Sequence, residues 1–172
     1  MCIFKIFKFS IPLILICIAY FALSLSVGQN MNETMSPHGQ ALYEYANKIG
    51  KKLEKKYEMY SLGVGGGATP EGIWLMSISF NRYGKPITET EARKLIISCV
   101  DDFLDSINNN DELRPFLKEY PFTSKNLDIT IFNFNNNDFL YLFPLIAVVN
   151  NSRGKIGYFT EDPSTQPKFP EQ

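Results

Sequence analysis

TETEARKLIISCVDDFLDSIN, residues 88–108, is the stretch that decides the fold. Its apolar side chains recur at about 100° per residue, which is typical of an amphipathic helix packed on a core. They are Ala92, Leu95, Ile96, Cys99, Val100, Phe103, Leu104 and Ile107. Thr88 and Glu91 have the spacing of a capping box, in which two side chains bind free backbone N–H groups at a helix start. The stretch therefore predicts a central helix that needs a large partner surface.

The segments around this helix predict that surface. A first helix is expected from about residue 37 to residue 59, and a short helical turn over 111–118. Alternating or continuous apolar runs predict strands over 71–80, 127–134, 145–149 and 155–160, with a loop over 150–154 between the last two. The glycine-rich run 60–68 is expected to be a twisted edge strand or a wide hairpin turn.

These elements predict an α+β fold in the order α-β-β-α-(short α)-β-β-β. We expect an antiparallel sheet of about five strands, with the two long helices packed on one face. The other face is expected to be partly exposed and aromatic, with Trp74, Phe132 and Phe134 as candidates for it.

Length and charge limit the classes of protein that fit. The 172 residues suit one domain, placed at 40–160, together with a targeting segment. The whole chain has 17 basic and 18 acidic residues, and residues 1–28 contain two of the basic ones, Lys5 and Lys8, and no acidic one. Without that segment the balance is 15 − 18 = −3, so nucleic acid is an unfavoured partner. The body keeps one cysteine, Cys99, which excludes an intrachain disulfide there.

Residues 1–28 have the three-part layout of a secretory signal peptide. Lys5 and Lys8 precede an apolar run over 11–25, and the small residues Ser26 and Gly28 follow. If this leader is cleaved, the protein is periplasmic or secreted. If it is retained, residues 9–27 form a single membrane span with the C-terminal domain outside the cytoplasm. Residues 29–39 are expected to be a loose linker, and 161–172 a disordered proline-rich tail.

Residues with catalytic potential do not form a known motif. His38 has no second imidazole with which to build a metal site, and Cys99 lies within the apolar arc of the central helix. Asp101, Asp102 and Asp105 gather on the opposite, solvated side of that helix. We therefore predict no catalytic residue, no metal and no cofactor, and keep a carboxylate hydrolase as an alternative.

Two groups of residues are candidate binding sites. The first is the glycine run with its neighbours: Gly65, Gly66, Gly67, Trp74, Arg82 and Tyr83. The run lacks both the ending of a phosphate-binding loop and the helix that should follow it. The second group is a row of lysines on the first helix: Lys48, Lys51, Lys52, Lys55 and Lys56. It is either a phosphate-seeking face or a solvated helix face.

Several runs resemble a group of small exported proteins of intracellular bacteria, chiefly chlamydia-like ones. The runs are YGKPIT at 83–88, EARKLI at 91–96, LRP at 113–115, YPFT at 120–123 and IFN at 131–133. The resemblance implies no activity. It implies a location at a Gram-negative envelope or a host interface.

The combined expectation is a non-enzymatic binding or interaction module outside the cytoplasm. Its partner would be a protein or an envelope component, with membrane contact through residues 9–27 if the leader is kept. The alternatives are a small envelope hydrolase that uses carboxylates and a membrane-tethered structural protein.

Overall fold

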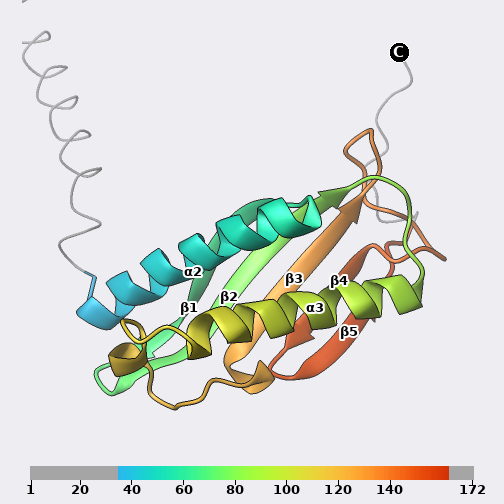
Figure 1. Cartoon of the computed structure of the whole chain (residues 1–172). Coiled ribbons are helices and arrows are strands. Elements are labelled where there is room, and N and C mark those ends of the chain that lie inside the picture. The colour runs from blue at the N-terminus through green and yellow to red at the C-terminus, as the bar shows by residue number, and fades with distance from the viewer. Residues whose placement is uncertain (1–34, 163–172) are drawn as a thin grey trace, which may run out of the picture. The chain divides into compact units, whose positions relative to one another are not determined.

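The computed structural model describes residues 35–162, which form one five-stranded sheet with two long helices on one face (Figure 1). The elements are α2 (Pro37–Tyr57), β1 (Tyr60–Thr69), β2 (Gly72–Tyr83), α3 (Glu89–Asn108), β3 (Leu127–Phe134), β4 (Val148–Ser152) and β5 (Lys155–Phe159). Two short 3-10 helices, η1 (Arg114–Phe116) and η2 (Ser124–Asn126), lie between α3 and β3. The predicted α+β class and element order are confirmed, with η1 in place of the short α-helix.

The sheet is mixed, with strand order β1-β2-β3-β4-β5. Three neighbouring pairs are antiparallel, but β2 and β3 run parallel. The prediction of a wholly antiparallel sheet was therefore wrong at this pair. The reason is that α3 connects the two strands and carries the chain back along the sheet, so that β3 starts at the same end as β2.

The core lies between the helices and the sheet. In α3, the side chains of Ala92, Ile96, Cys99, Phe103 and Ile107 are fully buried, as the sequence predicted, and they pack in one cluster with the inward side chains of the strands. On α2 the cluster includes Leu42, Ala46, Ile49 and Leu53. Both helices therefore pack their apolar faces against the same side of the sheet.

The last hairpin is tighter than predicted. β4 begins at Val148 instead of residue 145 and extends through Ser152, so the expected loop over 150–154 shrinks to Arg153 and Gly154. Both residues have positive φ, 49° and 82°. A two-residue turn of this kind matches the twist of the flanking strands, which explains why the ladder continues up to it.

The predicted leader, residues 1–28, lies outside the described residues, as do the candidate span 9–27 and most of the tail, 163–172. Pro37, His38 and Gly39 fell both in the predicted linker, 29–39, and at the predicted start of the first helix; they belong to the first turn of α2. Between residues 35 and 162 no helix has the length and apolar character needed to cross a membrane.

We expect Thr88→Ala to lower the free energy of unfolding by about 1 kcal/mol, because it removes the N-cap of α3. The Thr88 hydroxyl accepts a hydrogen bond from the Glu91 backbone N–H at 3.2 Å, and the Glu91 carboxylate accepts one from the Thr88 N–H at 2.8 Å. Urea denaturation measures the change. Thr90→Ala, at an exposed position within the first turn of the same helix, is the control, and equal effects of the two substitutions would contradict the capping role.

Candidate binding face

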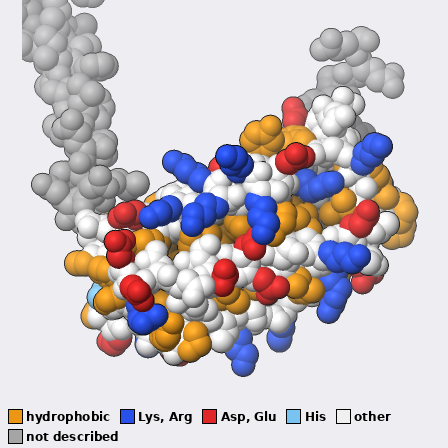
Figure 2. Space-filling view, in the orientation of Figure 1, with side chains coloured by type: hydrophobic (Ala, Val, Ile, Leu, Met, Phe, Trp, Pro, Cys, Tyr) orange, Lys and Arg blue, Asp and Glu red, His pale blue; other side chains and the backbone are white. Residues whose placement is uncertain are grey.

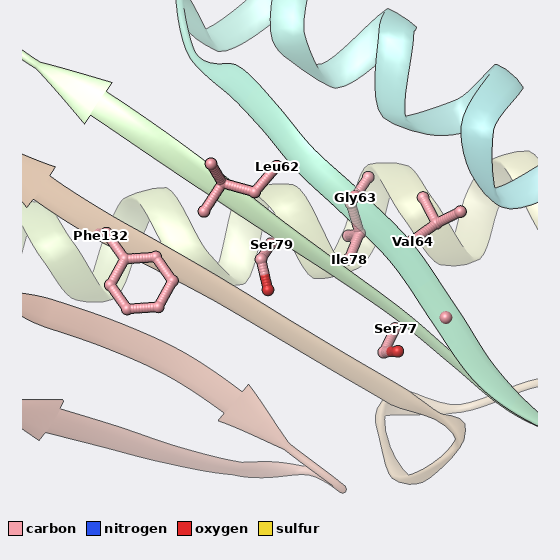
Figure 3. Close-up of a pocket in the computed structure, with 8 residues that line it drawn as sticks. Leu62, Gly63, Val64, Ser77, Ile78, Ser79 and Phe132 are labelled. Atoms are coloured by element: carbon pink, nitrogen blue, oxygen red, sulfur yellow. The ribbon is translucent and has the colours of Figure 1, made fainter. Parts of the chain in front are cut away.

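The second face of the sheet, which we call the open face, is the side turned away from α2 and α3. Along β3, the buried residues Leu127, Ile129 and Ile131 alternate with the half-buried residues Thr130, Phe132 and Phe134. The second set points away from the helices. Figure 3 looks onto this face, with the helices behind the strands. The expected exposed, partly aromatic face is therefore present, with Phe132 and Phe134 on it.

A groove of about 370 Å³ lies on the open face over β1, β2 and β3 (Figure 3). It is lined by Leu62, Gly63, Val64, Gly65, Ser77, Ile78, Ser79 and Phe132. None of these side chains is charged, so the groove suits an uncharged group. Its volume is at the lower end of the range for small ligand sites.

Leu62 and Phe132 form the apolar rims of the groove. Leu62 is a β-bulge residue, because Ser61 pairs with Phe80 while Gly63 already pairs with Ser79. The extra residue leaves Leu62 without a partner on β2, and its side chain is 56% exposed. A bulge re-aims a side chain in this way at the edge of a sheet.

Ser77 and Ser79 provide the polar part of the groove. They are two positions apart on β2, so both hydroxyls point to the open face. Among the described residues neither hydroxyl has a hydrogen-bond partner. These hydroxyls can each donate one hydrogen bond and accept others, so a bound group would meet two free polar contacts between apolar rims.

A row of aromatic rings crosses the strands at one end of the open face. The rings of Tyr60 and Tyr83 meet edge to face with centroids 5.7 Å apart, and the rings of Tyr83 and Phe134 stack at 5.5 Å. Tyr60 is 64% exposed. The row adds apolar surface near the groove.

Trp74 lies on the same face at the other end of β1. It is the extra residue of a second bulge, because Leu75 pairs with Gly67 while Ile73 pairs with Ala68. The indole ring lies directly over Gly67, where any β-carbon would overlap it. The guanidinium of Arg153 lies 5.4 Å from the ring centroid. Trp74 is therefore held in place by its neighbours.

The structure brings together only part of the first predicted site. Gly65, Gly67, Trp74 and Tyr83 share the open face. Gly66 faces the other way, since a β-carbon on it would lie 2.9 Å from Leu42 Cδ1 of α2. The Arg82 guanidinium donates to the Lys85 backbone oxygen at 3.0 Å and lines no part of the groove.

The glycine run itself is an edge strand, the first of the two predicted possibilities. Sequence reasoning placed Phe132 on the exposed face but missed Leu62, Ser77 and Ser79. The serines carried a usable signal, because they are the polar positions of an otherwise apolar alternating strand. Leu62 carried none, since a bulge is not visible in the spacing of residues.

The five lysines of the second candidate site are all exposed on α2. Lys56 Nζ lies 2.6 Å from the Asp102 carboxylate of α3. Lys48 and Lys52 line a depression of about 390 Å³ together with Asp105, Asp111 and Glu112. Acidic side chains therefore lie among the basic ones on this surface, as Figure 2 shows along α2. This mixture weakens the row as an anion-binding face.

Asp102 joins the two helices. Its carboxylate accepts hydrogen bonds from Lys56 Nζ and from the Tyr57 hydroxyl, each at 2.6 Å. Burial alone would raise the pKa of Asp102, but these two hydrogen bonds outweigh it and lower that pKa. Burial and the bond to Asp102 raise the pKa of Tyr57. Asp105 accepts from Asn109 Nδ2 of its own helix at 2.8 Å, so the two carboxylates have separate partners.

Cys99 and His38 both lie in the helix layer. Burial, helped by the Asp102 charge, raises the pKa of the fully buried Cys99 thiol to about 12. The thiol therefore stays protonated near neutral pH, which agrees with the predicted buried apolar role. The His38 and Phe116 rings meet edge to face, with centroids 5.8 Å apart. Neither residue lines the groove.

No protein-family model, no curated protein and no solved structure was found to match this chain. The resemblance to exported proteins of chlamydia-like bacteria therefore stays a prediction. The function has to be argued from the geometry of the open face.

We expect Gly67→Ala to displace the indole of Trp74, because the new methyl group would overlap the ring. Trp74 is the single tryptophan of the chain, so its fluorescence emission reports the change directly and should move to longer wavelength. Overpacking of this kind costs about 1–3 kcal/mol of stability. Gly65→Ala is the control, since its β-carbon would meet only Ser77 Oγ, at 3.1 Å. Unchanged emission from Gly67→Ala would contradict the position of the ring.

We expect Asp102→Asn to lower stability near neutral pH by about 1 kcal/mol, a modest value because the pair with Lys56 is partly exposed. A lowered carboxyl pKa stabilises the fold above the ordinary pKa of about 4, and this contribution is lost as the pH falls through the folded-state pKa. The difference between wild type and variant should therefore shrink below about pH 4. Urea denaturation across a pH series measures it.

Asp101→Asn is the matched control for this test, because Asp101 is exposed on the same helix and is not in the ion pair with Lys56. A pH-independent difference for Asp102→Asn, or an equal one for Asp101→Asn, would show that the bond between the helices is not responsible.

Proposed function

We propose that this protein is a non-enzymatic binding module that holds a partner on the open face of its sheet. The observation that carries the proposal is the groove between Leu62 and Phe132. It combines an exposed apolar rim at Leu62 and a half-buried one at Phe132 with two hydroxyls, Ser77 and Ser79, that have no partner among the described residues, and its lining is uncharged. Such a surface buries apolar area in a complex and fixes the orientation of the bound group through hydrogen bonds.

The exposure of the apolar side chains supports binding by this face. Tyr60, Leu62 and Trp74 are 64%, 56% and 36% exposed. Apolar side chains exposed on one face of a domain are a feature of interaction surfaces. The face of the sheet that the helices cover offers no such surface to a partner, because its apolar side chains are already packed in the core.

The residues with catalytic potential have other tasks. Cys99 is buried and protonated, Asp102 holds α2 to α3, and His38 contacts Phe116. None of them lines the groove. This distribution favours a binding module over the carboxylate hydrolase.

The location of the module is proposed from the sequence. The basic and apolar leader, residues 1–28, implies export, and the resemblance to exported proteins of chlamydia-like bacteria implies an envelope or a host interface. A partner at such a site would be a protein or another envelope component.

The proposal is tested by screening the purified full chain against two sets of probes, an array of bacterial glycans and a displayed library of short random peptides. At least one set should yield binders whose affinity falls roughly tenfold with Phe132→Ala, because this change removes an apolar rim of the groove. Ile97→Ala is the matched control, since it removes an exposed apolar side chain from α3. Absence of binders from both sets, or equal effects of the two substitutions, would contradict the proposal.

A further inference from the structure

The two edges of the sheet differ in how they are protected. β5 is five residues long and begins with Lys155, and the segment after it bridges to Leu142. β1 is ten residues long and contains no charged residue and no proline. Natural proteins usually shorten, charge or interrupt an edge strand, because its free backbone groups attract another strand. Within residues 35–162, the two bulges are the only such protection of β1.

The bulges leave a regular stretch between them. From Gly63 to Gly67 the pairing with β2 runs without interruption, Gly63 with Ser79 through Gly67 with Leu75. Four of these five residues are glycines, so no side chain covers the backbone at those positions. Among the described residues, β2 is the only hydrogen-bonding partner of this stretch. The outward N–H and C=O groups of residues 63–67 therefore have no backbone partner within residues 35–162.

α2 would support one more strand at this edge. The helix packs directly over β1, and Figure 3 shows it behind and beyond the outer side of that strand. Lys48 and Lys52 lie on the flank of α2 that faces α3. Tyr43 and Glu54 lie on the other flank, where Glu54 Oε1 accepts a hydrogen bond from the Ser61 backbone N–H of β1 at 2.5 Å. Tyr43 is 47% exposed there, so an added strand would cover it.

From these features we infer that an extended segment of a partner polypeptide binds along the outer edge of β1 as a sixth strand. The inference rests on the proposed function and names the class of partner. In this mode, backbone hydrogen bonds supply the affinity and pockets for alternate side chains supply the specificity. The groove beside Gly63 and Gly65 is such a pocket on the open-face side.

The chemistry of the two sides defines the segment. Side chains directed to the open face meet the uncharged groove and its rim at Leu62, so an apolar or aromatic residue is favoured there. Side chains directed to the helix meet the flank of α2, where Tyr43 and Glu54 lie. The partner is therefore an extended peptide with an uncharged, apolar residue at every second position, over about the five positions Gly63 to Gly67.

The test uses peptides selected from the displayed library by the full chain and then synthesised. Each peptide is also made with a single N-methyl group at successive backbone positions. Methylation should weaken binding roughly tenfold at every second position, because only alternate N–H groups of an added strand bond to the edge. Hydrogen exchange should slow at the outward-facing amides within residues 63–67 when the peptide binds. Phe132→Ala should weaken binding, while Ile97→Ala should not.

The other outcomes separate the inference from the proposed function. Selected peptides that depend on Phe132 but show no alternation on methylation, and no slowed exchange in β1, overturn the added strand and leave the binding face intact. Glycans that bind in a Phe132-dependent manner, with no peptide selected, also overturn the inference and support the proposed function. Failure of both sets of probes overturns both.

Discussion

The packing of both helices on one face of the sheet is the constraint on which the rest of the structure depends. α3 offers a face of buried side chains, from Ala92 to Ile107, that needs a large apolar partner surface, and the sheet provides it. α2 packs beside it on the same side, and the Asp102 carboxylate binds the two helices together through Lys56 and Tyr57. Because no described helix is left for the other side, that side becomes the open face. The site is a consequence of how the core is formed.

Much of the fold was predictable because local patterns decide it. The apolar arc and the capping box of α3 are encoded in adjacent turns, and both are present in the structure. The alternation along β3 gave its two faces correctly. The parallel pairing of β2 and β3 was not predictable from such patterns. The direction of β3 relative to β2 depends on where the connecting helix, α3, packs on the sheet. That packing is a long-range property of the chain.

The candidate site was predicted less completely than the fold. Trp74 was singled out on the strand that follows the glycine run, and Tyr83 in the segment that leads into the central helix; both lie on the open face. Arg82 was chosen by proximity in sequence alone, but its guanidinium closes a local turn with Lys85. Leu62 reaches the groove only through the bulge opposite Phe80 and Ser79. A β-bulge, in which two residues of one strand face a single residue of the neighbouring strand, cannot be recognised from composition or from the spacing of apolar residues.

Packing within the fold requires some of the glycines of β1 but not all of them. Glycine within a strand costs stability, since it brings backbone freedom and no side chain to pack. Gly66 is required because α2 and the Leu75 backbone leave no room for a β-carbon, and Gly67 because the Trp74 ring lies on it. Gly65 has no such requirement: its φ is compatible with other residues, and a β-carbon would meet only Ser77 Oγ, at 3.1 Å. What a side chain at Gly65 would do is fill the groove between Leu62 and Phe132. The absence of a side chain there keeps the groove open and the neighbouring backbone of the edge accessible, which is what a binding surface at this place requires.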